Sequence, residues 1–463
     1  MLNNTLNQEN FIKKFENHEF FFYGINWWPL IKVQVAYQLH LKDIGIFKLN
    51  DSSKCFSEVV TKITLGDGLK FYRETFKRNK SIKNIIVTDS NNKINFAPNS
   101  KVLINPYTDP FIDYFEKLNI NYSVFDYKKE NFFLGFNIKK LKKVYLERVK
   151  NQFNKNSEIK FKLKEFCDFL SQQYGKDFNL YNHLVQNIIT NQAEYFTYFN
   201  ILKKSDVKNI LLYCYYNNTM MSIIRAANKL NIVTVEYQHS QVTSNHFAYS
   251  SWKAMQTNET NFFPSKIWTW RQSDAEYLER QFQDVKKIDY IIGGNLSLEL
   301  SKKTEVIKTD SLIKVLVTLQ GTGLPDFVIN CLDKYPHVVL YLRLHPRYSQ
   351  DKEVCEMLKL KYKEQIEIDK ANSLTLYELF SFADYHLTNF SGCAIEAEYF
   401  DVTNIIYGDR GYLAYENEIK NKKYLFINDQ DDLDFIFDQK IKYKANSRMK
   451  KKDICKLITE NFN

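Results

Sequence analysis

The chain alternates between short runs of apolar residues and longer stretches in which apolar residues recur every three or four positions. Short apolar runs bounded by turn-forming residues are typical of buried strands, and the wider spacing is typical of amphipathic helices. Strands that alternate with helices form parallel sheets covered by helices on both faces. The runs predict strands over 82–87, 102–105, 122–126, 207–213, 232–237, 268–270 and 288–292, and then over 313–319, 338–342, 383–388 and 403–407.

The predicted strands fall into two groups, separated by a polar and charged stretch. A chain of 463 residues also exceeds what one hydrophobic core usually supports. We therefore expect an α/β protein with two Rossmann-like domains. The first domain covers 1–295 with a helical insertion at about 136–202, the linker covers 296–311, the second domain covers 312–431, and a basic helical tail that we expect to cross back to the first domain covers 432–463.

Composition narrows the class of protein. Hydrophobic residues make up 44% and charged residues 25% of the chain, which are values typical of globular proteins. The seven cysteines stand without close pairs, so neither a zinc site nor a disulfide framework is predicted, and free thiols fit a reducing cytoplasm. The polar N-terminus does not resemble a signal peptide, and no apolar run approaches the ~20 residues of a membrane span.

The formal charge of +10 raises the question of a polyanionic partner. Lysines are mixed with acidic residues along most of the chain, and no nucleic-acid-binding motif is present, so we expect no nucleic-acid partner. Basic clusters over 139–143 and 450–452 are typical of solvated helix faces. Alternatively, they attach the protein weakly to the anionic inner face of a membrane. The expected location is the cytoplasm, with peripheral contact at the membrane.

The first candidate site follows the strand that begins at Val338. That strand ends in Arg343, and His345, Pro346 and Arg347 come directly after it. Loops at the carboxyl ends of parallel strands form the ligand crevice of an open α/β sheet. Proline suits the first turn of the next helix, and arginine offers forked donors to a phosphate. This segment therefore predicts an anion site with a histidine at its mouth.

A second candidate site follows the strand predicted over 383–388. Ser391 and Gly392 open a helix that we expect to run to about Phe400, with Ser391 as its N-cap. The free N–H groups of a helix that starts after a strand attract anions. Glu396 lies one turn into this helix. Two anion sites at strand ends of one parallel sheet are much less expected by chance than either alone.

A third strand end in the second domain has a loop of small residues. Gln320 and Gly321 follow the strand predicted over 313–319. Glycine there would let a ligand approach the backbone closely. We include both residues among the candidate ligand-binding positions.

The first domain offers titratable groups at its own strand ends. Glu236 lies near the end of the strand predicted over 232–237, and His239 lies just beyond it. A histidine has an unperturbed pKa of about 6.5, so it can accept a proton near neutrality. Asp89 is an alternative base on an earlier strand end, and His246 is a secondary candidate. A plain hydrogen-bonding role for His239 is the structural alternative.

Several of these segments resemble the GT-B glycosyltransferases that assemble bacterial capsules and lipopolysaccharide. The similar segments are 24–29, 236–239, 293–295 and 319–320. The segments around His345 and Ser391 resemble the donor-binding motifs of sialyltransferases, Kdo transferases and CDP-glycerol glycerophosphotransferases. The chain departs from these families at Ser240, where glycine is usual, and at Gly392, where a second hydroxyl is common. The resemblance implies two domains that face each other across a cleft.

The resemblance also implies roles for the candidate residues. His345, Arg343, Arg347 and the helix that begins at Ser391 would stabilise the charge on a leaving nucleoside phosphate. His239 would take the proton of the acceptor hydroxyl, and Glu236 would orient it. Glu396 would bind the ribose. No Asp-x-Asp arrangement suggests a metal-dependent donor site, so we expect catalysis without a metal and without a cofactor. The implied partners are a nucleotide-sugar donor, with CMP or another nucleotide, and a glycan or lipid-linked glycan acceptor.

Three alternatives remain open. A nucleotide-sugar epimerase of the kind that acts on UDP-N-acetylglucosamine shares the fold and a similar Ser-Gly helix start. That family carries paired acids there, whereas Glu396 is followed by Ala397. A glycerophosphotransferase would use the same donor-side groups. A non-catalytic relative would bind nucleotide or glycan within an assembly complex, although candidate groups are present at both His239 and His345.

Overall fold

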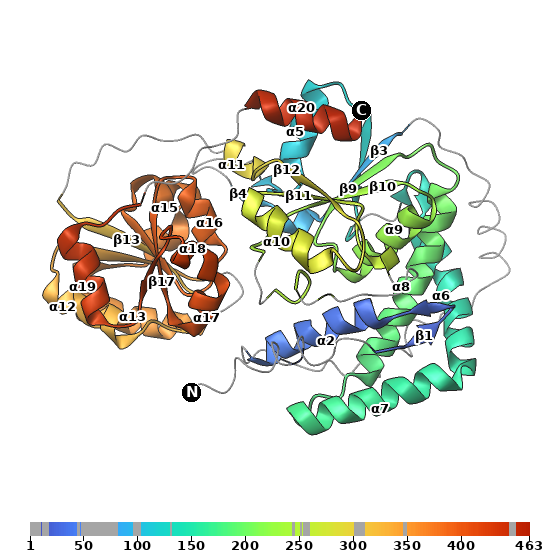
Figure 1. The fold of residues 1–463 in the computed structure, drawn as a ribbon, viewed down its shortest axis with the longest axis horizontal. Coiled ribbons are helices and arrows are strands. Elements are labelled where there is room, and N and C mark those ends of the chain that lie inside the picture. Colours follow the sequence, from blue (N-terminus) through green and yellow to red (C-terminus); the bar gives the residue numbers. More distant parts are fainter. Residues whose placement is uncertain are drawn as a thin grey trace.

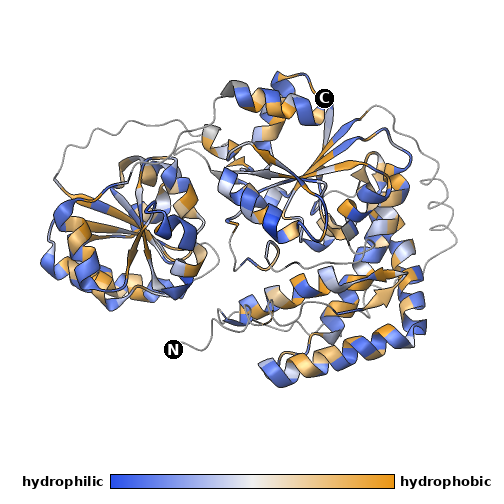
Figure 2. Ribbon diagram, in the orientation of Figure 1, coloured by the Kyte–Doolittle hydropathy of each residue, from blue (hydrophilic) through white to orange (hydrophobic). Residues whose placement is uncertain are grey.

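The computed structural model describes residues 11, 18–43, 47, 82–95, 103–129, 132–242, 246–250, 252, 260–300, 311–345, 350–443 and 451–463. Two α/β domains lie side by side, and each is built on a six-stranded sheet (Figure 1). The strands are largely hydrophobic, while most helices are hydrophilic on one side (Figure 2). Sheets buried on both faces need this pattern. The expected fold class, two Rossmann-like domains, is confirmed.

The first sheet has the strand order β12-β11-β10-β9-β3-β6, and its neighbouring strands are all parallel. Tyr237 on β10 pairs with Tyr213 on β9 and with Trp268 on β11, so these three strands end at the same level. The loops that follow them therefore meet at one edge. The strands are β3 (Asn84–Thr88), β6 (Tyr122–Asp126), β9 (Asn209–Tyr213), β10 (Val233–Tyr237), β11 (Lys266–Thr269) and β12 (Asp289–Ile292).

The second sheet has the order β15-β14-β13-β16-β17-β18 and is also parallel. Numbered from the start of this domain, the order is 3-2-1-4-5-6, which is the doubly wound arrangement. The order reverses between β13 and β16, and ligands bind at such switch points. The strands are β13 (Ile313–Thr318), β14 (Val338–Arg343), β15 (Ile366–Glu367), β16 (Tyr385–Thr388), β17 (Thr403–Tyr407) and β18 (Leu425–Ile427).

Helices cover both faces of the first sheet. One hydrophobic core lies between that sheet and a group of helices that includes the predicted helical segment. These helices lie together in Figure 1. Asn137 and Asn156 accept hydrogen bonds that begin α6 and α7, so the sequence itself divides this segment into separate helices. The helices in this core are α2 (Trp28–Asp43), α6 (Ile138–Lys155), α7 (Ser157–Tyr174), α8 (Tyr181–Leu202), α9 (Asn218–Lys229) and α10 (Gln272–Phe282).

The opposite face of the first sheet is covered by α5 (Asp109–Lys117) and by α20 (Lys451–Phe462) at the end of the chain. Ile454, Ile458 and Phe462 of α20 share a core with Phe111 and Trp268. The chain thus returns from the second domain to the first, and α20 lies against α5 (Figure 1).

In the second domain, two cores lie on opposite faces of the sheet. Helix α19 (Gln430–Gln439) belongs to this domain, because Leu433, Ile436 and Phe437 pack with its strands. Only the last part of the predicted tail therefore crosses to the first domain. The other helices are α12 (Asp326–Lys334), α13 (Asp351–Tyr362), α14 (Asp369–Ser373), α15 (Leu376–Phe382), α16 (Cys393–Glu398), α17 (Gly408–Ala414) and α18 (Glu416–Lys420).

The predicted linker begins with a short helix, α11 (Leu296–Leu300). Leu296 packs in the core of the first domain, whereas Leu298 packs in a core of the second. The first residues of the linker are therefore part of the contact between the domains.

Some local predictions are wrong. Of the predicted strand over 102–105, the structure describes 103–105, and these residues do not join the main sheet. Instead, β5 (Leu103–Ile104) pairs antiparallel with β4 (Ile94–Asn95) in a hairpin outside it. Ser273 and Glu276 have the spacing of a capping box, but α10 begins earlier, at Gln272, and has no side-chain cap. Two more hairpins pair β1 (Phe21–Phe22) with β2 (Ile25–Asn26) and β7 (Phe132–Phe133) with β8 (Phe136–Asn137).

A buried histidine links three neighbouring strands of the second sheet through hydrogen bonds. His386 on β16 is fully buried, with Nε2 2.8 Å from Thr318 Oγ1 on β13 and Nδ1 2.7 Å from Asn404 Oδ1 on β17. The amide nitrogen of Asn404 donates to the carbonyl of Ala394 in α16 at 2.8 Å. This chain of hydrogen bonds ties three strands to the helix that follows β16. Burial lowers the pKa of His386 to about 4.

We expect His386 to make the protein acid-sensitive. In the unfolded chain its pKa is about 6.5, so between pH 6.5 and about 4 the unfolded state takes up a proton that the folded state excludes. The free energy of unfolding should then fall by about 3 kcal/mol across this range, at about 1.4 kcal/mol per pKa unit. Urea titrations of the wild type and of His386→Gln at several pH values measure how much of this pH dependence comes from His386. Equal pH dependence in both proteins would contradict the assignment, and His337→Gln, at an exposed site, is the control.

Candidate functional site

A cavity of about 450 Å³ lies between the carboxyl ends of the two sheets. Its wall includes the ends of β13 and β16, the switch point of the second sheet, and the loop after β10 from the first domain. This volume is typical of small-molecule sites. Seven of the predicted site residues line the cavity: His239, Gln320, Arg343, His345, Ser391, Gly392 and Glu396.

Arg343 is held at the cavity wall by its own fold. Its Nη1 donates to the carbonyl oxygens of Ala371 and Leu374 at 2.7 and 2.6 Å. Part of the forked donor set expected for a phosphate is therefore occupied in binding α14 and the residue that follows it. The guanidinium still places a cation at the cavity, although burial lowers its pKa. His345 lies two residues beyond, at the cavity wall, and Arg347 lies outside the described residues.

The segment after β16 also lines the cavity. Ser391 is buried, and its Oγ accepts a hydrogen bond from the backbone N–H of Cys393 at 3.3 Å. Gly392, not Ser391, stands at the N-cap position of α16, and the helix ends at Glu398, before the expected Phe400. The serine hydroxyl nevertheless satisfies one donor of the first turn, as a capping residue does.

Glu396 is the carboxyl group of this cavity. Tyr377 donates a hydrogen bond to its Oε1 at 3.2 Å, and burial raises the pKa of Glu396 to about 7. The side chain is thus more readily protonated than an exposed glutamate. It lies on the same short helix as Gly392, so one element presents both groups to the cavity.

Gly321 has a different role from the one expected. Its N–H donates to Asp351 Oδ2 at 2.7 Å, and the N–H of Gly323 donates to Asp351 Oδ1 at 2.9 Å. Both glycines have positive φ angles, which suit this tight loop. Gly321 is absent from the cavity wall, and Gln320 alone of the pair reaches it. Sequence reasoning missed Asp351, the buried carboxylate that shapes the loop.

His239 is surrounded by aromatic rings. The rings of Tyr107, Tyr213 and Tyr216 lie 5.9, 6.0 and 5.6 Å from the imidazole, measured between centroids. The hydroxyl of Tyr216 is 3.0 Å from His239 Nε2 and 3.4 Å from Nε2 of His246. Tyr216 was not predicted. It follows β9 as His239 follows β10, and the register of these parallel strands was the available signal.

The hydrogen bonds allow an assignment of the protons. Burial lowers the pKa of His246 to about 3, so this imidazole is neutral. Its Nδ1 accepts the N–H of Ala248 at 3.3 Å, and its own proton is therefore on Nε2. Burial raises the pKa of Tyr216, which stays protonated and has its hydroxyl hydrogen available for His239. We assign His239 Nε2 as the acceptor of that hydrogen bond.

Glu236 does not line the cavity. It is fully buried, and its Oε1 accepts hydrogen bonds from Tyr249 at 2.7 Å and from the N–H of Tyr215 at 3.1 Å. Burial raises its pKa to about 8. The expected orientation of His239 by Glu236 is therefore replaced by the contact with Tyr216, and the glutamate instead fixes the loop at Tyr249.

Asp89 is also turned away from the cavity. Its Oδ1 accepts the N–H of Asn91 at 2.9 Å and caps the 3-10 helix Ser90–Asn92, and Tyr127 donates to Oδ2 at 3.3 Å. Of the titratable groups that we proposed for the first domain, His239 alone is at the cavity wall. Within the part of the chain that the structure describes, no three His, Cys, Asp or Glu side chains are grouped as metal ligands, and no helix is long and apolar enough to cross a membrane.

Comparison with known proteins leaves the family open. No protein-family model matches the chain, and no curated protein sequence is significantly similar to it. Similar solved structures do exist. The UDP-GlcNAc 2-epimerase of Methanocaldococcus jannaschii, solved with UDP-GlcNAc and UDP, is 12% identical, with a TM-score of 0.47, over 82% of this chain and 99% of that one.

Two transferases are similar to a lesser degree. The wall teichoic acid polymerase TagF is 11% identical, with a TM-score of 0.37, over 89% of this chain and 92% of that one. The spinosyn rhamnosyltransferase SpnG, solved with spinosyn aglycone, is 8% identical, with a TM-score of 0.39, over 82% and 95% of the two chains.

Proposed function

We propose that this protein is a glycosyltransferase that moves a sugar from a nucleotide-activated donor to a glycan acceptor. The observation that carries the proposal is the cavity between the two sheets. It joins Arg343, His345, Ser391 and Glu396 of the second domain to His239 of the first. A donor site and a proton acceptor that meet in one cavity are what a transfer between two substrates requires.

The second domain would hold the donor. Bond cleavage leaves negative charge on the nucleoside phosphate, and Arg343 and His345 lie where cations and donors would stabilise that charge. These groups are fixed before the reaction, Arg343 by its hydrogen bonds to backbone carbonyls, so little reorganisation is needed. Glu396 would accept hydrogen bonds from the ribose hydroxyls. No step in this scheme uses a metal.

The first domain would supply the base. The acceptor hydroxyl attacks the anomeric carbon, the bond to the donor phosphate breaks, and the hydroxyl proton passes to His239. In the structure Nε2 accepts a hydrogen bond from Tyr216. The proton would therefore reach Nε2 either directly, when the acceptor displaces the tyrosine, or through the tyrosine hydroxyl. Tyr216 is a positioning residue in this scheme.

The acceptor class rests on the short motifs described above, which resemble enzymes of capsule and lipopolysaccharide assembly. A lipid-linked acceptor would bring the protein to the inner face of the membrane. The lysines over 139–143 begin α6, and Lys139 and Lys140 are exposed there, so they are available to anionic lipid headgroups.

Nucleotide binding tests the proposal. We would measure the melting temperature with CMP, CDP, UDP and GDP, since a ligand at 100 times its Kd stabilises the folded state by about 2.7 kcal/mol. Stabilisation by a cytidine nucleotide above the others would favour the sialyltransferase, Kdo transferase and glycerophosphotransferase group. Sugar isomerised without an acceptor would indicate an epimerase. If no nucleotide raises the melting temperature, the proposal is wrong.

Nucleotide binding should also depend on pH through Glu396. Burial raises the pKa of Glu396 to about 7, so the charged form that accepts two ribose hydroxyl bonds is lost as pH falls through 7. The association constant should then decrease by up to about tenfold per pH unit below that value. Calorimetric titrations between pH 6 and 8 measure the effect. Glu396→Gln should bind more weakly and without this pH dependence, while Glu353→Gln, an exposed change on α13, should behave as the wild type.

A further inference from the structure

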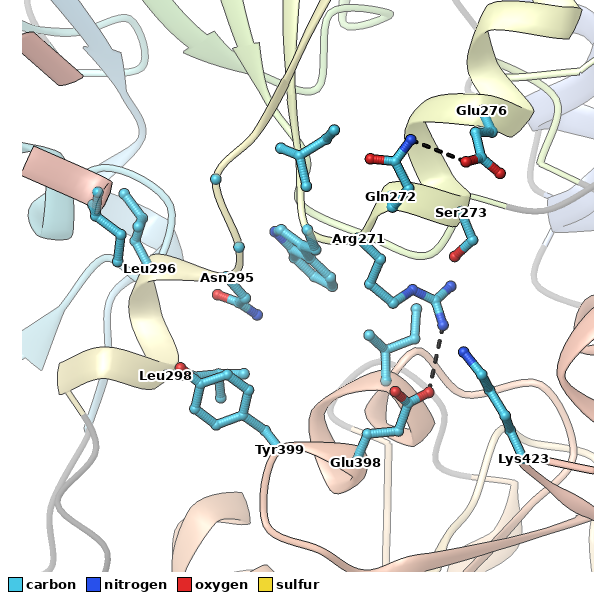
Figure 3. Close-up of a pocket in the computed structure, with 16 residues that line it drawn as sticks. Arg271, Gln272, Ser273, Glu276, Asn295, Leu296, Leu298, Glu398, Tyr399 and Lys423 are labelled. Carbon is cyan, nitrogen blue, oxygen red and sulfur yellow. Dashed lines mark hydrogen bonds and ion pairs between the residues drawn. The ribbon is translucent and has the colours of Figure 1, made fainter. Parts of the chain in front are cut away.

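A second chamber of about 480 Å³ adjoins the donor cavity. Trp270 and Asn295 line both spaces, so they stand at the boundary. Gln272 and Glu276 of α10 lie on one side of the chamber, Asn295 and Leu298 lie on another, and Glu398, Tyr399 and Lys423 of the second domain close it (Figure 3). Ile454 of α20 completes the wall, so the returning helix helps to form this space.

The chamber carries no excess of positive charge. Its lining holds two cations, Arg271 and Lys423, and two carboxylates, Glu276 and Glu398. The guanidinium of Arg271 is already paired with Asp274 at 2.7 Å, with Glu418 at 2.9 Å and with Glu398 at 3.4 Å. A phosphate would find no unpaired arginine here. The donor cavity differs, because there the guanidinium of Arg343 bonds to the backbone carbonyls of Ala371 and Leu374, which do not neutralise its positive charge.

The lining combines aromatic and planar polar groups. Trp270 comes from the first domain and Tyr399 from the second. Gln272 donates to Glu276 at 2.9 Å, and both side chains are exposed at the rim. Sugar rings have apolar C–H faces, which pack on aromatic rings, and hydroxyl edges, which bond to amides and carboxylates. The floor is apolar and buried at Leu296, Leu298 and Ile395.

The wall next to Trp270 is rigid. The backbone N–H of Trp270 donates to Gln238 Oε1 at 2.8 Å. A side chain at Gly293 would meet the Trp268 indole at 2.0 Å, so that position accepts only glycine. Asn295 Oδ1 accepts hydrogen bonds from Tyr237 at 3.0 Å and from Ser297 Oγ at 2.7 Å. The boundary between the two spaces is therefore held in place from the first domain.

We propose that this chamber binds sugar units of the acceptor glycan, as an electrically neutral subsite beside the cationic donor cavity. The inference rests on the proposed transferase function and adds to it the place and chemistry of the acceptor. Its volume, within the range of about 300–1,000 Å³ typical of ligand sites, admits more than one sugar ring. The chain of the glycan would extend outward past Gln272 and Glu276.

The test uses the whole protein and an array of immobilised oligosaccharides of capsular and lipopolysaccharide type, probed with saturating nucleotide present. Gln272→Trp fills the chamber from its exposed rim, and Tyr399→Ala removes one aromatic wall. We expect the wild type to bind at least one glycan and each variant to bind it at least tenfold more weakly. Glu279→Trp places the same ring at an exposed position of α10 outside the lining, and it should bind normally.

Nucleotide affinity separates the two proposals. All three variants should bind nucleotide as the wild type does, because none of the substituted residues lines the donor cavity. If the wild type binds nucleotide but no glycan, or if Gln272→Trp binds glycan undiminished, the acceptor chamber is wrong and the donor site stands. If the wild type binds no nucleotide, the proposed function itself fails and this inference fails with it.

Discussion

His239→Ala should abolish sugar transfer and leave nucleotide affinity nearly unchanged. A positioned general base contributes about 10²–10⁴-fold to a rate, and of the titratable groups proposed for the first domain His239 alone lines the cavity. Its ring comes from the first domain and the donor groups come from the second, so the substitution should remove nothing that binds the nucleotide. Single-turnover transfer rates and calorimetric nucleotide titrations give the two readouts. His239→Gln separates proton acceptance from hydrogen bonding, since glutamine keeps only the second.

Two further substitutions check this assignment. Tyr216→Phe removes the hydroxyl that lies 3.0 Å from His239 Nε2. It should slow transfer less than His239→Ala does and shift the pH profile of the rate, because the imidazole loses its fixed partner. Asp89→Asn should transfer sugar normally, since Asp89 caps a short helix away from the cavity. Normal transfer by His239→Ala together with inactive Asp89→Ala would place the base on the earlier loop.

His345→Ala should lower turnover on the order of 10²-fold, as the loss of one oxyanion donor does. His345 lies at the cavity wall and is only partly buried, so the protein should keep its fold. The turnover number with saturating donor is the measurement, and the melting temperature without ligand checks the fold.

The same strand provides a matched control for His345. His337 precedes the amino end of β14, is exposed, and lies at the opposite edge of the sheet from the cavity. His337→Ala should retain wild-type turnover. Wild-type turnover in His345→Ala as well would show that the histidine at the carboxyl end is not part of the donor site.

The strands were predictable from local sequence because a parallel sheet buries both of its faces. Such strands read as continuous apolar runs, and the run over 313–319 became β13 while the run over 403–407 became β17. The segment 102–105 has the same appearance but forms a hairpin outside the sheet, since a short apolar run does not specify its partner. The partner of each strand depends on the strand order of the whole sheet, and strand order is a non-local property.

The positions of the candidate residues followed a topological rule. Parallel strands end at one edge, so residues just after several strands meet there, as His345, Ser391 and Gln320 do. The rule gives the edge but not the direction of each side chain. Gly321 directly follows a cavity residue and Glu236 lies three residues before one, yet they bond to Asp351 and Tyr249 instead.

The sequence by itself therefore determined the two α/β domains, the strand ends that form the cavity and seven of the residues at its wall, because these depend on hydrophobic periodicity and on the shared edge of parallel strands. Only the tertiary structure decided the hydrogen-bond partners. Tyr216 beside His239, the carbonyls bound by Arg343 and the carboxylates of Glu398 and Glu418 around Arg271 come from elements distant in sequence or from the other domain. Their contacts depend on how the sheets, helices and domains pack, and no local pattern records that packing.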